Sequence, residues 1–306
     1  MMRRQFGVEK ILAVRALVLA VFSIFFAALA AAHPTRAQQT SQTAPGSYLA
    51  VEGSRIYYEE CGAGPEAVLL IHDGIAHSAV WDQVWGNFCK VFHTIRYDRR
   101  GYGRSGPADS FYTEADDTLA LLRHLKIRHA FLIGSSHGGA LAINFTLAHP
   151  DLVEELVLVG AVVDGYGFSD HFLARGIENS KPMQKNDTAG LIANWVNDKY
   201  VFAPGHEAAK KQLQEILTAY PQDLTHEDYA RLAPSALPRL REIRVPTLIL
   251  VGDADIPDVH AHAGVIETGI PNSRRVVIRD AGHLMYLEKP EEFSRVVIQF
   301  LEQNRD

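Results

Sequence analysis

The sequence predicts an α/β fold, in which a mostly parallel sheet of eight strands is flanked by helices. Short apolar runs alternate with segments whose apolar residues recur every three or four positions, from about residue 48 to residue 163 and again from about residue 245. Strands that alternate with helices form parallel sheets, because each crossover helix packs on a face of the sheet. The chain has 306 residues, 47% of them hydrophobic, so it can bury the core that such a sheet requires.

The N-terminal segment is typical of a targeting sequence. Two arginines precede an apolar run over residues 16–32, and small residues suit cleavage after Ala37. The alternative is a retained membrane anchor, because residues 11–32 could span a bilayer. We therefore expect a signal peptide at residues 1–37, a polar spacer at residues 38–47, and export to the periplasm or the medium.

The strands and helices of the core follow in chain order. Strands are expected at residues 48–51, 55–59, 67–71, 93–97, 130–133, 156–159, 247–251 and 275–278. Helices are expected at residues 79–89, 115–126, 137–149 and 290–303. The core therefore comprises residues 48–163 and 245–306.

Residues 164–244 interrupt the alternation. They contain no strand pattern, and helical periodicity appears at residues 191–201 and 206–220 between several prolines. This insertion is much longer than a crossover needs. We interpret it as a helical cap after the sixth strand, over one end of the sheet. Its aromatic residues could line a substrate site or belong to the core: Trp195, Tyr200 and Phe202.

A G-x-S-x-G motif at residues 134–138 follows the strand at 130–133 and precedes a helix. Small residues on both sides of Ser136 allow a tight turn, and the helix N-terminus places the His137 N–H and a positive dipole beside the serine oxygen. Such a turn presents a serine as a nucleophile. Ser135 lacks the flanking glycines, so we expect it to be packed or to cap the helix.

A serine hydroxyl needs a base to take its proton and an acid to orient that base. His283 follows the last strand, and Asp255 follows the strand before it, so both lie at the same end of the sheet as Ser136. The order Ser136, Asp255, His283 is that of one of the three common triad arrangements. Asp253 is the rival acid, two residues away.

At this point the sequence resembles the α/β-hydrolase fold superfamily, in particular its small capped esterases, lactonases and peroxidase-like hydrolases. Four blocks carry the resemblance: residues 69–74 (L-L-I-H-D-G) with Trp81, residues 97–105 (Y-D-R-R-G-Y-G-R-S), the turn at Ser136, and residues 280–283 (D-A-G-H) with 287–293 behind them. The resemblance implies that Ser136 is the nucleophile, His283 the base and Asp255 its orienting acid.

An oxyanion hole requires two N–H groups aimed at the developing negative charge. One should come from His137. By resemblance, the second comes from Gly74, with Ile75 as the alternative. The family has glycine where this chain has Asp73, and a carboxylate there would oppose catalysis, so we expect Asp73 to point away or to be hydrogen-bonded. We expect His72 to hold the loop after the strand at 67–71 in place.

The two cysteines are Cys61, at the end of the second strand, and Cys89, at the end of the first helix. In the fold that the resemblance implies, the second strand and the strand after that helix are antiparallel neighbours. Export would favour a disulfide, and two buried thiols are the alternative.

The net charge of −6 disfavours binding to nucleic acid. His260 and His262 lack a third ligand nearby, so no metal site is expected. We also expect Arg99 and Arg100 to brace neighbouring loops, with binding of a substrate anion as the alternative.

These observations predict a cofactor-free serine hydrolase that cleaves esters or lactones of small, partly apolar molecules. In the superfamily that the sequence resembles, epoxide hydrolysis and dehalogenation use an aspartate at the position of Ser136, so the resemblance argues against those two reactions. Carbon–carbon bond hydrolysis, acyl transfer or perhydrolysis would use the same residues, and a non-catalytic binding protein is a further alternative. If the signal is cleaved, no stable membrane association is expected, and the substrate and oligomeric state are left open.

Overall fold

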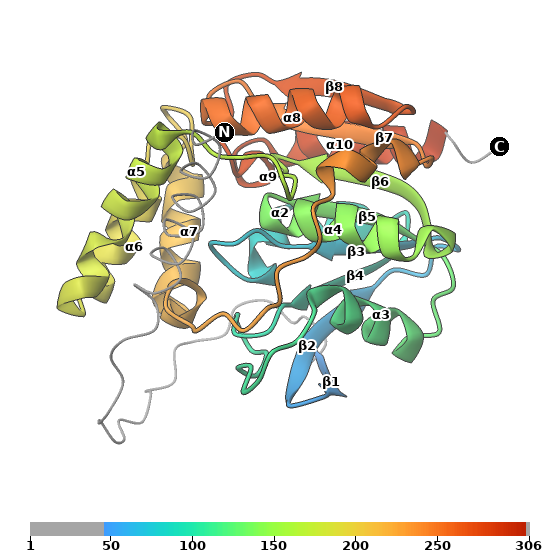
Figure 1. Ribbon diagram of the computed structural model, residues 1–306, viewed down its shortest axis with the longest axis horizontal. Helices are drawn as coiled ribbons and strands as arrows, with labels where there is room; N and C mark the ends of the chain where they lie inside the picture. The colour runs from blue at the N-terminus through green and yellow to red at the C-terminus, as the bar shows by residue number, and fades with distance from the viewer. Residues whose placement is uncertain (1–45, 304–306) are drawn as a thin grey trace, which may run out of the picture. The chain divides into compact units, whose positions relative to one another are not determined.

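In the computed structural model, which describes residues 46–303, eight strands form one sheet (Figure 1). The strand order is β1-β2-β4-β3-β5-β6-β7-β8, and β2 is antiparallel to both β1 and β4, whereas all other neighbours are parallel. The strands are β1 (Ser47–Val51), β2 (Ser54–Cys61), β3 (Ala67–Ile71), β4 (His93–Asp98), β5 (Ala130–Ser135), β6 (Val153–Val159), β7 (Thr247–Gly252) and β8 (Ser273–Ile278). The predicted fold class is confirmed. The predicted signal peptide and nearly all of the spacer lie outside the described residues.

Helices cover both faces of the sheet. They are α2 (Asp82–Cys89), α3 (Glu114–His124), α4 (His137–Ala148), α8 (Pro257–Gly269), α9 (Met285–Glu288) and α10 (Pro290–Gln303). Side chains alternate along β3: Val68 and Leu70 belong to the core shared with α2 and α10, whereas Leu69 and Ile71 belong to the core shared with α3, α4 and α8. All four are fully buried, which explains why the central strands are continuous apolar runs.

Three helices lie between β6 and β7: α5 (Asp170–Ser180), α6 (Thr188–Val196) and α7 (Glu207–Ala219). They contact one another in chain order, at one side of the sheet in Figure 1. The predicted segment at 206–220 corresponds to α7, whereas the one at 191–201 overlaps α6 but extends past the end of that helix at Val196. Helix α5 escaped sequence analysis, although Ser169 caps its N-terminus by accepting a hydrogen bond from the Phe172 N–H.

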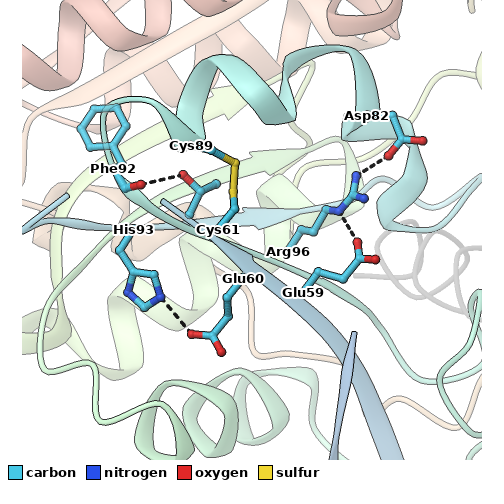
Figure 2. The surroundings of a disulfide bond; sticks show 9 residues. Glu59, Glu60, Cys61, Asp82, Cys89, Phe92, His93 and Arg96 are labelled. Carbon is cyan, nitrogen blue, oxygen red and sulfur yellow. Dashed lines mark hydrogen bonds and ion pairs between the residues drawn. A yellow bond between two sulfur atoms is a disulfide. The ribbon is translucent and has the colours of Figure 1, made fainter. Parts of the chain in front are cut away.

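A disulfide joins Cys61, at the end of β2, to Cys89, at the end of α2, with Cα atoms 5.3 Å apart (Figure 2). Close by, the buried Arg96 side chain donates to Glu59 at 2.6 Å and to Asp82. Of the two states left open for the cysteines, the structure has the bonded one. Within residues 46–303, none of the helices is long and apolar enough to cross a membrane.

Candidate active site

Ser136 occupies the turn between β5 and α4. Its backbone has φ 52° and ψ −115°, a conformation that costs a residue with a side chain about 1–2 kcal/mol. The turn is tight: a Cβ on Gly134 would lie 2.3 Å from the Gly138 carbonyl oxygen, and one on Gly138 would lie 2.3 Å from the His72 carbonyl oxygen. Both glycines of the motif are therefore required. Ser135, by contrast, is fully buried and its hydroxyl lies 3.2 Å from the Tyr286 hydroxyl.

His283 and Asp255 form a buried pair. The His283 Nδ1 lies 2.9 Å from Asp255 Oδ2 and 3.1 Å from Oδ1. Asp255 follows β7, and His283 follows β8, as the sequence predicts. The rival Asp253 accepts a hydrogen bond from the Ala281 N–H at 3.3 Å instead. The acid that contacts the histidine is thus Asp255.

Gly160 links this pair to the serine. The Ser136 N–H donates to the Val159 carbonyl at 2.8 Å, and Gly160 comes next in the chain. A Cβ on Gly160 would lie 3.1 Å from His283 Nδ1 and 3.3 Å from Asp255 Oδ2. The Ser136 turn therefore lies close to the His283–Asp255 pair, at the carboxyl edge of the sheet. Among residues 46–303, the Ser136 hydroxyl makes no hydrogen bond to His283, and such contacts in free enzymes often shorten only when substrate binds.

The electrostatics of His283 suit a base. Burial lowers the pKa of His283, but the charge of Asp255 and its hydrogen bond raise it more, so the pKa lies above its usual value. Because the carboxylate can only accept, Nδ1 carries the proton that faces Asp255. The neutral ring therefore leaves Nε2 as its proton acceptor.

The two predicted oxyanion donors are neighbours. A Cβ on Gly74 would lie 3.6 Å from the Cβ of His137. Within the described part of the chain, neither residue's N–H donates to a protein acceptor. The Ile75 N–H donates to Asp73 Oδ1 at 2.6 Å and is thus occupied. This contact favours Gly74 over Ile75 as the second donor.

The Asp73 carboxylate is fully buried and hydrogen-bonded. Oδ1 accepts from the N–H groups of Ile75 and Ala76, and Oδ2 accepts from the Tyr286 hydroxyl at 2.9 Å. The expectation that this carboxylate would be hydrogen-bonded is confirmed. No local motif points to Tyr286, because only the fold brings α9 against the loop after β3.

His72 and two arginines support the loops around the site. The Arg99 N–H donates to His72 Nε2 at 2.9 Å, so Nδ1 carries the proton and donates to the Asp73 carbonyl. Burial holds the pKa of His72 well below its usual value. Arg99 also donates to that carbonyl, and Arg100 binds both oxygens of Asp117 at 2.6 and 2.7 Å. Arg99 thus braces the loop after β3, and Arg100, which also donates to the Glu52 carbonyl between β1 and β2, braces a second loop, as expected.

One of the two histidines that were considered and rejected as metal ligands, and some of the cap aromatic residues, have structural contacts. His262 is buried and accepts a hydrogen bond from the Val163 N–H, and burial lowers its pKa to about 4. Among residues 46–303, no group of three or more His, Cys, Asp or Glu side chains could hold a metal ion. Phe202 is in the core, whereas Trp195 and Tyr200 are partly exposed.

The segment between β6 and β7 is attached to the site at two places. At one, the His283 N–H donates to the Tyr200 carbonyl at 2.9 Å. Nearby, the Glu288 carboxylate accepts from the N–H groups of Gly282 and Ala203 at 2.7 and 2.6 Å. The loop that carries His283 is therefore held against this segment.

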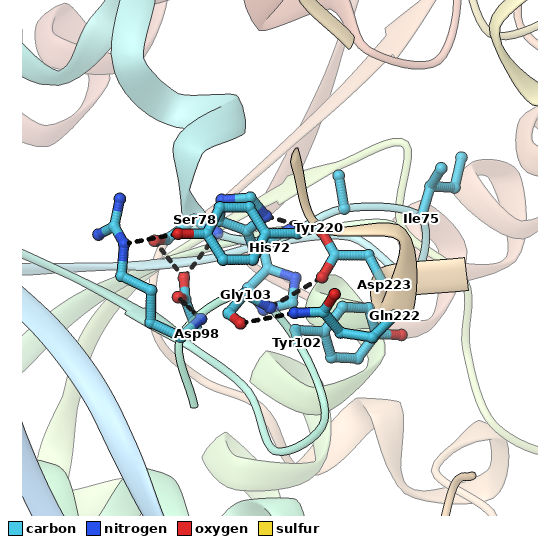
Figure 3. A network of polar contacts seen from close by, with 12 residues as sticks. His72, Ile75, Ser78, Asp98, Tyr102, Gly103, Tyr220, Gln222 and Asp223 are labelled. Carbon is cyan, nitrogen blue, oxygen red and sulfur yellow. Dashed lines mark hydrogen bonds and ion pairs between the residues drawn. The ribbon is translucent and has the colours of Figure 1, made fainter. Parts of the chain in front are cut away.

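At the other place, Asp223 binds the loops after β3 and β4 (Figure 3). Its carboxylate lies 2.7 Å from His77 Nδ1 and accepts from the Gly103 N–H at 2.8 Å. Burial lowers the pKa of His77, but Asp223 and nearby Asp98 raise it more, so it lies above the usual value. No local motif signals this pair, whose partners are far apart in sequence.

Comparisons with known proteins agree with this fold. A family model described as the alpha/beta hydrolase family matches residues 68–296. The serine hydrolase BPHL of Homo sapiens is 27% identical over 283 residues, which are 89% of this chain and 90% of that protein. The 2-hydroxy-6-oxononadienedioate/2-hydroxy-6-oxononatrienedioate hydrolase of Escherichia coli is 27% identical over 86% of this chain and 98% of its own length. A thermophilic esterase from Thermogutta terrifontis has a similar fold, with a TM-score of 0.73, 23% identity, and coverage of 85% of this chain and 99% of the esterase.

Proposed function

The chain belongs to the alpha/beta hydrolase family and is a hydrolase, and on that premise we propose that it cleaves carboxylic esters or lactones of small, partly apolar molecules through an acyl-enzyme. One observation carries the proposal. The Ser136 turn, the His283–Asp255 pair and the unengaged N–H groups of Gly74 and His137 meet at one edge of the sheet.

In the proposed mechanism, Ser136 Oγ attacks the substrate carbonyl carbon while His283 Nε2 takes the hydroxyl proton. The carbonyl oxygen becomes negative and is stabilised by the N–H groups of Gly74 and His137. Collapse of this intermediate breaks the ester bond, and His283 returns the proton to the leaving alcohol. Water then attacks the acyl-enzyme by the same route, which releases the acid and restores Ser136.

Two carboxylates have different roles in this mechanism. Asp255 holds the Nδ1 proton of His283 and stabilises the imidazolium that forms. Asp73 is close in sequence to the proposed oxyanion donor Gly74, but its charge is satisfied by two N–H groups and a tyrosine hydroxyl. Its hydrogen bonds thus reduce its opposition to a developing oxyanion.

The nucleophile is tested with a fluorophosphonate probe and a panel of chromogenic esters and lactones. We expect the probe to label the wild-type protein and Ser135→Ala, but not Ser136→Ala. Hydrolysis should fall by several orders of magnitude in Ser136→Ala, with folding retained. Absence of labelling in folded wild-type protein, or equal labelling of Ser136→Ala, would refute the mechanism.

Carbon–carbon bond hydrolysis is a second candidate. The E. coli relative is named for a 6-oxo substrate, which is a ketone, and hydrolysis at a ketone breaks a carbon–carbon bond. The same serine, histidine and aspartate support that reaction. Product analysis on ketones and on esters of similar shape separates the two candidates.

We also propose that the protein is exported, with residues 1–37 removed as a signal peptide. The Cys61–Cys89 disulfide supports this location, because disulfides persist in oxidising compartments. N-terminal sequencing of protein from its native host should begin at Gln38. A full-length N-terminus in the membrane fraction would instead indicate an anchor.

A further inference from the structure

Arg175, in α5, is an arginine with most of its hydrogen-bonding capacity unused. Its side chain is only 13% exposed, and Nε donates to Asp198 Oδ2 at 2.6 Å. Within the described part of the chain, neither Nη nitrogen has a hydrogen-bond acceptor. A guanidinium has five N–H donors, so four are left for another acceptor. Solvent reaches both Nη nitrogens, since neither is a fully buried atom without a partner, so a bound anion would replace water there.

Tyr200 connects the guanidinium to the loop of the proposed catalytic histidine. Its central carbon is 5.8 Å from the centre of the Tyr200 ring, and the Tyr200 carbonyl accepts the His283 N–H at 2.9 Å. The positive charge of Arg175 acts to lower the pKa of His283, although burial and Asp255 have larger effects. A ligand held by Arg175 would therefore lie at the segment that is attached to the His283 loop.

The arginine is also held in place. The Asp198 carboxylate that binds it accepts further hydrogen bonds from the Asn179 side chain at 2.7 Å and the Tyr200 N–H at 2.9 Å. The Trp195 ring packs on the guanidinium, with its centre 5.4 Å away. A fixed, planar fork of donors matches the two oxygens of a carboxylate.

We propose that Arg175 binds a carboxylate of the substrate, so that the preferred esters or lactones are acidic molecules. This inference rests on the proposed hydrolytic function and adds a substrate class to it. The carboxylate belongs either to the acyl part or to the leaving group of the substrate, because both parts flank the carbonyl that reacts next to His283.

The test compares acidic and neutral substrates in matched pairs. For the acyl side, 4-nitrophenyl monoesters of straight-chain dicarboxylic acids are compared with 4-nitrophenyl esters of monocarboxylic acids of equal length. For the leaving group, 4-nitrophenyl butyrate is compared with the same ester bearing a ring carboxylate. The measured quantity is the ratio of kcat/KM for the acidic substrate to that for its neutral match, corrected for spontaneous hydrolysis.

We expect the wild-type ratio to exceed one on at least one side and to fall about 10- to 100-fold in Arg175→Met. Arg175→Lys should recover only part of it, since a lysine keeps the charge and loses the fork. Lys199→Met is the matched control, because the Lys199 amine packs 4.7 Å from the same Tyr200 ring but its side chain is exposed. This control should keep the wild-type ratio.

Two measurements keep the result interpretable. Thermal unfolding of Arg175→Met is compared with that of the Arg175→Met/Asp198→Asn double variant, which leaves no unpaired buried carboxylate. Binding of adipate to Ser136→Ala, by calorimetry, should be lost when Arg175→Met is added. This binding assay tests the carboxylate site even if no ester is hydrolysed. Absence of ester hydrolysis would refute the proposed function but not the carboxylate site.

An acidic-to-neutral ratio that is the same in wild type and Arg175→Met would overturn the inference. An equal fall in Arg175→Met and Lys199→Met would do so as well, because it would indicate a general effect of net charge.

Discussion

Gly160 offers a direct test of the geometry around the proposed catalytic pair. Its backbone has φ 53°, and a Cβ there would lie 3.1 Å from two atoms of the His283 ring and 3.3 Å from Asp255 Oδ2. Ordinary contacts of this kind exceed 3.4 Å, so a methyl group must displace the ring or the backbone by a few tenths of an ångström. The substitution Gly160→Ala should therefore disturb the pair without removing any catalytic group.

Two effects of Gly160→Ala can be separated. The left-handed backbone costs an alanine about 1–2 kcal/mol of stability, and the displaced histidine should lower kcat/KM about 3- to 10-fold, since a misplacement of about 1 Å can cost about 100-fold. Gly205→Ala is the matched control. Gly205 also has a positive φ, of 92°, but a Cβ there would have no atom within 4 Å.

The assay is ester hydrolysis, with the concentration of active protein determined by titration with a fluorophosphonate, and urea unfolding gives the stability of each variant. We expect both alanine variants to be destabilised but only Gly160→Ala to lose activity per active site. Equal kcat/KM in Gly160→Ala and Gly205→Ala would show that the His283 ring does not depend on the space above Gly160, and the reasoning would fail.

Three further outcomes are expected. In Asp255→Asn, kcat/KM should fall by orders of magnitude. The acidic limb of its pH–rate profile should also move to lower pH, because the carboxylate raises the pKa of His283, which must be neutral to act as a base. An unmoved acidic limb would contradict this. Replacing both Cys61 and Cys89 by serine should lower the free energy of unfolding in urea by about 3–4 kcal/mol, from the entropy of the closed loop, and an unchanged midpoint would count against it. Glu288→Ala leaves two buried N–H groups without acceptors, at about 1–3 kcal/mol each; the urea midpoint should fall, and a wild-type midpoint would show that the carboxylate does not support this loop.

The strands and the nucleophile turn could be read from the chain because their signals are local. The central strands β3, β5, β6 and β7 contain short apolar runs, and the Ser136 turn is recognisable from glycines two residues on either side. Helix α5 was missed, since its residues 170–180 carry only a narrow apolar stripe that does not stand out among polar neighbours. Short amphipathic helices take much of their stability from packing, which sequence periodicity describes poorly.

Local signals did not distinguish between candidate site residues that are close together in the sequence. Asp253 and Asp255 are two residues apart, and only the packing of the loop after β7 against the loop after β8 decides which carboxylate contacts His283. Likewise, Gly74 and Ile75 are adjacent, and the Asp73 carboxylate occupies the N–H of the second. Such choices depend on individual hydrogen bonds, which form only in the folded chain.

Composition, periodicity and short motifs in this chain were thus enough for the fold class and for the strands in chain order, and together with the family resemblance for the segments that bear the proposed catalytic groups; the order of the strands within the sheet came from the structure. Contacts between distant segments emerged only in the folded chain: the Asp223–His77 pair, the attachment of Tyr200 to the His283 loop, and the open guanidinium of Arg175. The physical reason is the distance along the chain over which each interaction acts. Backbone propensity acts over a few residues, whereas a hydrogen bond between side chains far apart in sequence exists only after the core has brought them together.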